Sequence, residues 1–84
     1  MNKHAIYQIV EMVIKDVLPD INENLISGTK SLKDLGANSI DRMEVITMSL
    51  EKIGIKIPLI NFAKVTNIEG IVDVLAENLG KNLN

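Results

Sequence analysis

Apolar residues recur at the spacing of an α-helix in three separate stretches of this chain. In residues 3–17 they trace one face of a helix, which ends before Pro19 because proline cannot continue the helical hydrogen-bond pattern. The positions on that face are Ile6, Ile9, Val10, Val13, Ile14 and Val17. A second helix is predicted over residues 39–53, and Gly54 supplies the kind of residue that commonly closes a helix.

A third helix is predicted to begin at a capping box formed by Thr66 and by Glu69 three residues later. Its apolar face consists of Ile68, Ile71, Val72, Leu75 and Leu79. Gly80 is expected to end this helix and to leave residues 81–84 frayed.

The segments between the predicted helices differ in character. Residues 20–38 have no periodicity, which predicts a long loop. Its apolar residues are expected to anchor it across the helices, and a short helical turn near residues 32–35 is compatible with the sequence. Residues 55–58 are predicted to be extended, and residues 59–64 to form one short helical turn. The predicted fold class is therefore all-α, with three main helices, a short fourth helix and a long first loop, in a single domain of residues 1–84.

Composition narrows the classes of function. Hydrophobic residues make up 46% of the 84 residues and aromatic residues only 2%, so the core must be aliphatic. A net charge of −2 without a basic run gives no drive toward nucleic acid. No apolar run approaches the ~18 residues of a membrane span, and residues 1–4 lack a signal-peptide pattern. We therefore expect a cytoplasmic monomer with neither nucleic-acid nor membrane partners.

The residues that usually perform catalysis are sparse. His4 is the only histidine, and no serine or acid beside it completes a triad. The carboxylates are spread along helix faces, and no pair of them is spaced for acid–base chemistry. There is no cysteine, and no cluster has the spacing of metal ligands. The sequence predicts no catalytic site and no metal site, so we do not expect an enzyme.

One motif stands out for its chemistry, Asp34-Leu35-Gly36-Ala37-Asn38-Ser39-Ile40-Asp41. Gly36 allows a tight turn into the second helix. Asn38 is a good N-cap with Asp41 three residues later, which would leave Ser39 as the first helical residue with an unused hydroxyl. A phosphodiester attached there would lie at the positive end of the helix dipole. Alternatively Ser39 is itself the cap, and the local pattern does not separate the two interpretations.

This motif resembles the prosthetic-group motif of acyl carrier proteins, D-L-G-x-D-S-L-D, and the resemblance covers nearly the whole chain. It implies a small four-helix acyl-carrier-like bundle, with 4′-phosphopantetheine attached to Ser39 by a phosphopantetheinyl transferase that uses coenzyme A. An acyl group would then form a thioester with the terminal thiol of the arm, so that the chain imports the sulfur it lacks. Asn38 and Ile40 depart from the usual aspartate and leucine, which bears on the choice of transferase and partner enzyme.

The run from Asn38 to Arg42, with Glu44, is similar to a narrower group: freestanding donor carriers of bacterial polyketide β-branching cassettes. This resemblance implies that an acyltransferase loads malonyl on the arm and that a ketosynthase-like decarboxylase converts it to acetyl. The carrier would then present acetyl to a hydroxymethylglutaryl (HMG)-synthase-like enzyme, which condenses it with a β-keto chain on another carrier.

The family resemblance also implies a partner-facing surface on the second helix. The candidate partner-binding residues are Ile40, Asp41, Arg42, Met43, Glu44, Thr47, Leu50, Glu51 and Phe62. Arg42 is the candidate recognition residue within this set. Met43, Leu50 and Phe62 are compatible with either the core or the docking surface.

Two alternatives to a donor carrier stay open. The chain could be a fatty-acid or aminoacyl carrier, although the mixed charge of the second helix argues against the first and the lack of a G-G-x-S core argues against the second. It could also be an unmodified helical adaptor that binds an apolar partner surface. Loss of acyl loading in a Ser39→Ala variant, with the fold retained, would separate a carrier from an adaptor.

Overall fold

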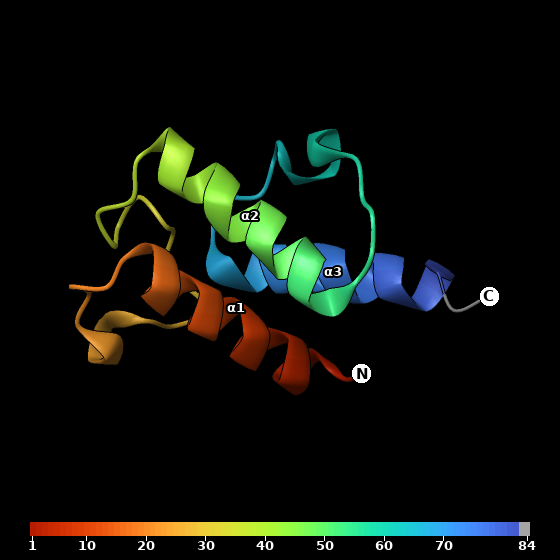
Figure 1. The fold of residues 1–84 in the computed structure, drawn as a ribbon, viewed down its shortest axis with the longest axis horizontal. Helices are drawn as coiled ribbons and strands as arrows, with labels where there is room; N and C mark the ends of the chain where they lie inside the picture. The colour runs from red at the N-terminus through yellow and green to blue at the C-terminus, as the bar shows by residue number, and fades with distance from the viewer. Residues whose placement is uncertain (83–84) are drawn as a thin grey trace.

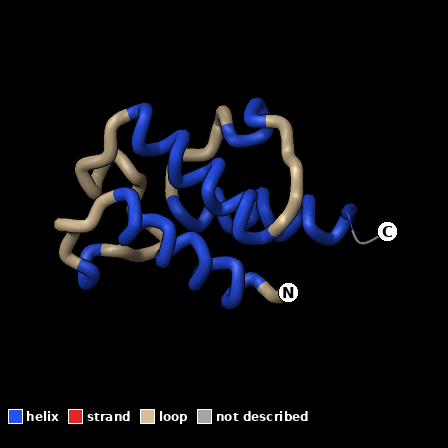
Figure 2. The backbone as a smooth tube through the Cα atoms, in the orientation of Figure 1, coloured by secondary structure: helices blue, strands red, loops and turns tan. Residues whose placement is uncertain are grey.

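Three α-helices of equal length form the frame of the protein in the computed structural model, which describes residues 1–82 and the side chains of residues 1–80. They are α1 (Lys3–Val17), α2 (Ser39–Ile53) and α3 (Ile68–Asn82). Two short 3₁₀ helices, η1 (Glu23–Leu25) and η2 (Leu59–Phe62), lie in the connections. The described residues contain no strand (Figure 2). These bounds confirm the predicted α1 and α2 and the short turn after Pro58, whereas η1 had no sequence signal.

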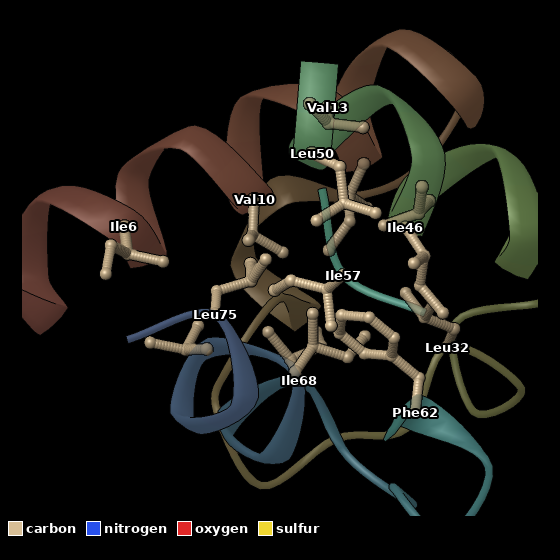
Figure 3. Close-up of a cluster of buried hydrophobic side chains, with 14 of the residues drawn as sticks. Ile6, Val10, Val13, Leu32, Ile46, Leu50, Ile57, Phe62, Ile68 and Leu75 are labelled. Atoms are coloured by element: carbon tan, nitrogen blue, oxygen red, sulfur yellow. The ribbon is translucent and has the colours of Figure 1, made fainter. Parts of the chain in front are cut away.

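The helix α1 packs against both α2 and α3 (Figure 1). The core between them is aliphatic apart from Phe62, whose ring points in from η2 beside Ile57 and Ile68 (Figure 3). Phe62 is only 1% exposed, so of the two interpretations left open for it the structure supports the core residue. Leu50 is likewise buried in this core, at 9% exposure.

The long first loop is fixed to α3, as its apolar anchors predicted. Ile26 and Leu32 are buried in the core. The backbone N–H of Ile68 donates to the carbonyl of Lys30 (2.9 Å), and that of Glu69 donates to the carbonyl of Gly28 (2.8 Å). Loop carbonyls thus take up N–H groups that a helix start leaves without a partner inside the helix. The loop is therefore a constrained part of the frame that carries α2.

Both predicted ends of the third helix need correction. The cap is Asn67 rather than Thr66, because α3 begins at Ile68 and Asn67 Oδ1 accepts a hydrogen bond from the N–H of Gly70 (2.8 Å). The helix also continues through Gly80 to Asn82. Glycine ends a helix when it adopts a positive φ, and among the described glycines only Gly36 and Gly54 do so. Near residues 32–35 the backbone forms successive turns rather than a helix.

One polar side chain in the core has no partner. Ser49 is fully buried on α2, and its hydroxyl makes no hydrogen bond in the described structure. A buried hydroxyl without a partner costs free energy, because it has lost its bonds to water. Ser49 therefore lowers the stability of the bundle.

Replacement of Ser49 by alanine is expected to raise the free energy of unfolding by about 1 kcal/mol, because the unpaired hydroxyl is removed and alanine favours a helix. Urea denaturation measures this change. Ser31→Ala is the matched control, since the Ser31 hydroxyl accepts a hydrogen bond from the N–H of Asp34 (2.9 Å), and this variant should be less stable. A lower urea midpoint for Ser49→Ala would contradict the expectation.

Candidate functional site

The site begins with a pair of reciprocal hydrogen bonds at the end of the long loop. The N–H of Ser31 donates to Asp34 Oδ2 (3.1 Å), and the N–H of Asp34 donates to the hydroxyl oxygen of Ser31 (2.9 Å). The backbone N–H of Ser31, followed by its side chain, holds the pKa of the Asp34 carboxyl below its ordinary value. Lys30 and Lys33 act in the same direction. The ionised carboxylate therefore stabilises this turn.

The next residue that shapes the site is Gly36. It has a φ of 91°, a backbone conformation that residues with a side chain rarely adopt. A Cβ built on Gly36 would have no atom within 4 Å, so glycine is required by its backbone conformation and not by lack of space. This turn carries the chain from the buried Leu32 to the start of α2 at the surface, as the sequence predicted.

A capping box fixes the start of α2. The N–H of Asp41 donates to Asn38 Oδ1 (2.8 Å), and the N–H of Asn38 donates to Asp41 Oδ2 (3.1 Å). Asn38 is therefore the N-cap, and the alternative in which Ser39 caps the helix is wrong. Ser39 is the first residue of α2, it is exposed, and the cap does not use its hydroxyl.

This arrangement suits a covalently attached phosphate ester. Ser39 is exposed at the positive end of the α2 dipole, where negative charge is stabilised. Asp41 stands in the same turn but its carboxylate is engaged with the N–H of Asn38. The residues present thus fit a phosphodiester on Ser39.

Apolar side chains are exposed on α2 and on η2. Ile40 is 72% exposed and Met43 42% exposed on the first turns of α2. Leu59 is 41% and Ile60 75% exposed on η2. We refer to these four side chains as the α2–η2 apolar surface. Met43 is therefore a surface residue, whereas Leu50 belongs to the core.

Polar candidate residues border this surface. Glu44 and Glu51 are exposed on α2, and the half-buried Thr47 donates its hydroxyl hydrogen to the carbonyl of Met43 (2.8 Å). Thr47, Leu50 and Glu51 also line an open groove of about 890 Å³ between the second half of α2 and residues 54–59. The groove reaches from α2 to Leu59.

Arg42 has an internal role that the sequence did not indicate. Its Nη2 donates to the carbonyl oxygen of Phe62 (2.9 Å) and to that of Val65 (3.1 Å). The guanidinium thus joins the first turn of α2 to the end of η2 and to the connection that leads to α3. No local pattern could reveal this, because the acceptors are backbone atoms 20 and 23 residues away.

Comparison with known proteins identifies the class. Residues 8–75, a range that includes Ser39, match the family of phosphopantetheine attachment sites. The chain therefore belongs to the acyl carrier proteins, which hold acyl groups on a 4′-phosphopantetheine arm. Within residues 1–82, no helix is long and apolar enough to cross a membrane, and no group of three or more His, Asp or Glu side chains could hold a metal ion.

Individual relatives span almost the whole chain. It is 37% identical over 79 residues to the polyketide biosynthesis acyl-carrier-protein AcpK of Bacillus subtilis, with 94% of this chain and 96% of that protein covered. An acyl carrier protein of Helicobacter pylori (strain G27) is 30% identical, with 88% and 95% covered. A chain in the crystal structure of the curacin pathway HMG synthase in complex with acetyl donor-ACP matches at a TM-score of 0.84 and 31% identity, with 92% and 99% covered. The small all-α carrier fold is confirmed by this match.

The cap and the exposed serine should contribute differently to stability. Asn38→Ala is expected to lower the free energy of unfolding by about 1 kcal/mol, because it removes an N-cap hydrogen bond. Ser39→Ala should change it by less than about 0.5 kcal/mol, because the hydroxyl is exposed and not used by the cap. Thermal or urea unfolding of the unmodified proteins measures both. Equal losses in the two variants would show that Ser39 shares in the cap.

The Asp34 turn should make stability depend on pH. Since the folded state lowers the pKa of this carboxyl, the unfolded chain takes up the proton first as the pH falls. The stabilisation is complete above the ordinary carboxyl pKa and is lost as the pH drops through the folded-state pKa. Urea midpoints measured from about pH 6 to about pH 2 should fall less steeply for Asp34→Asn than for the wild type. Parallel curves for the two proteins would remove Asp34 from the acid response.

Proposed function

We propose that Ser39 carries the 4′-phosphopantetheine arm of this acyl carrier protein. The observation that carries the proposal is the capping box, which leaves the Ser39 hydroxyl exposed at the first residue of α2. A phosphopantetheinyl transferase would form the phosphodiester between this oxygen and the pantetheine phosphate of coenzyme A, with release of the adenosine bisphosphate half. The acyl group is then held as a thioester on the thiol of the arm.

The proposed role is that of the donor carrier in polyketide β-branching. A polyketide carrier of Bacillus subtilis and a donor carrier from an HMG-synthase complex, both similar along nearly the full chain, support this role. An acyltransferase loads malonyl on the arm, and a ketosynthase-like decarboxylase removes carbon dioxide and leaves an acetyl thioester. The carrier then presents acetyl to an HMG-synthase-like enzyme. The chain itself is a non-catalytic carrier and acts in the cytoplasm as a monomer.

The α2–η2 apolar surface is proposed to dock on the HMG-synthase-like enzyme. Four exposed apolar side chains on α2 and η2 favour a protein partner over solvent. The bordering acidic groups on α2 are Asp41, Glu44 and Glu51, and Thr47 lies among them. Apolar contacts would supply affinity, while the acidic border would orient the carrier.

A fatty-acid carrier is the second candidate, favoured by the 30% identity to the Helicobacter pylori acyl carrier protein. The two candidates share the modification at Ser39 and differ in the enzyme that accepts the loaded arm. An aminoacyl carrier shares the modification as well, and an unmodified adaptor lacks it.

The first measurement is the intact mass of the protein after incubation with coenzyme A, magnesium and a broad-specificity phosphopantetheinyl transferase. We expect one pantetheine-sized gain in the wild type and none in Ser39→Ala. An absence of gain in the wild type with several active transferases would favour the adaptor.

The acetylated carrier is then mixed with an HMG-synthase of a β-branching cassette and, separately, with a fatty-acid ketosynthase. Transfer of acetyl to the first and not to the second is expected for a donor carrier. The reverse result would identify a fatty-acid carrier.

A further inference from the structure

Few local interactions fix the position of the short helix η2. It consists of four residues, and its N-cap, Pro58, makes no side-chain cap hydrogen bond. The buried ring of Phe62 anchors it to the core on one side. Ile60, by contrast, is three-quarters exposed.

The two hydrogen bonds of Arg42 anchor the same segment from the other side. One nitrogen of the half-buried guanidinium donates to the carbonyls of Phe62 and Val65. Since each terminal guanidinium nitrogen carries two N–H groups, both acceptors can be satisfied at once. The bonds run from the first turn of α2, three residues after Ser39, to the last residue of η2 and to Val65 in the connection that follows.

We propose that Arg42 is a positioning residue that fixes η2 against the start of α2, so that Ile60 and Ile40 form one docking surface for the HMG-synthase-like enzyme. The inference rests on the proposed function. Arg42 acts here through backbone carbonyls and not as a charge that the partner reads. It thereby replaces the recognition role that the sequence suggested for this residue.

The choice of arginine follows from the geometry. A lysine ammonium is a compact and strongly hydrated charge, whereas the planar guanidinium holds two neighbouring acceptors in fixed directions. Loss of the two bonds would release η2 at its end, and the amide hydrogen bonds within and after η2 would open more often. These bonds run from Ala63 to Ile60 (3.0 Å) and from Val65 to Phe62 (3.2 Å).

The test combines affinity with amide exchange in six holo-proteins: wild type, Arg42→Lys, Arg42→Gln, Ile60→Ala, the double variant Arg42→Gln/Ile60→Ala, and Lys52→Gln. Lys52→Gln is the matched control, because it removes an exposed positive charge from the same helix. The dissociation constant for an HMG-synthase of a β-branching cassette is measured for each protein. Hydrogen exchange of the Ala63 and Val65 amides is measured without the enzyme.

Positioning predicts coupled losses. Ile60→Ala and Arg42→Gln should each weaken binding by about ten-fold, and the double variant should be little weaker than Arg42→Gln alone. Exchange at Ala63 and Val65 should rise in Arg42→Gln and less in Arg42→Lys, in the same order as the loss of affinity. Lys52→Gln should leave exchange unchanged, and the transferase should modify every variant at the wild-type rate.

Four results would overturn the proposal. Unchanged exchange in Arg42→Gln would show that Arg42 does not hold η2. Wild-type affinity in Arg42→Lys with raised exchange, or losses that multiply in the double variant, would show that the partner reads the charge directly. A wild-type holo-protein that does not bind the enzyme at all would refute the proposed function, and the docking role with it, whatever the exchange data show.

Discussion

The reciprocal hydrogen bonds between Asn38 and Asp41 decide whether the Ser39 hydroxyl is free for the proposed modification. Without them, Ser39 would be the natural side chain to cap α2, and its oxygen would be occupied. Asn38 Oδ1 accepts from the N–H of Asp41, and Asp41 Oδ2 accepts from the N–H of Asn38. The cap is therefore complete without the Ser39 hydroxyl. The hydroxyl is therefore exposed while its backbone is fixed by the first turn of a helix. Modification at that oxygen would leave the cap in place.

The cap can hold Ser39 in a fixed position only if the structure beneath α2 is itself held in place. The long first loop provides part of that support. The carbonyls of Gly28 and Lys30 accept from the first residues of α3, and the turn from Ser31 to Gly36 then leads into α2. The start of α3 and the start of α2 are thus linked through one short stretch of backbone. The frame consists of backbone hydrogen bonds and aliphatic packing, which suits a chain with 2% aromatic residues.

Features set by neighbouring residues could be predicted from the sequence, and features set by distant ones could not. The bounds of α1 and α2 and the capping box follow from periodicity and from residues three positions apart. The start of α3 depends on carbonyls from the first loop, so Thr66 was the wrong cap. The roles of Phe62 and Arg42 could not be predicted for the same reason. An aromatic ring can face the core or solvent, and a guanidinium can donate to any carbonyl within reach, so the outcome depends on residues far away in the sequence.

The internal use of Arg42 also changes the character of the carrier surface. A positive charge on the first turn of α2 offsets Asp41 and Glu44 in a count of charges, yet the Arg42 guanidinium is half-buried and donates to carbonyls of the same chain. In the proposed docking mode, the partner would then meet exposed Ile40 and Ile60 together with acidic groups on α2. Electrostatic attraction mainly sets how fast and in which orientation partners meet, whereas buried apolar contacts hold the complex. In the proposed complex, the carrier would distinguish partners by the shape of this apolar contact, and that shape would depend on where η2 is held.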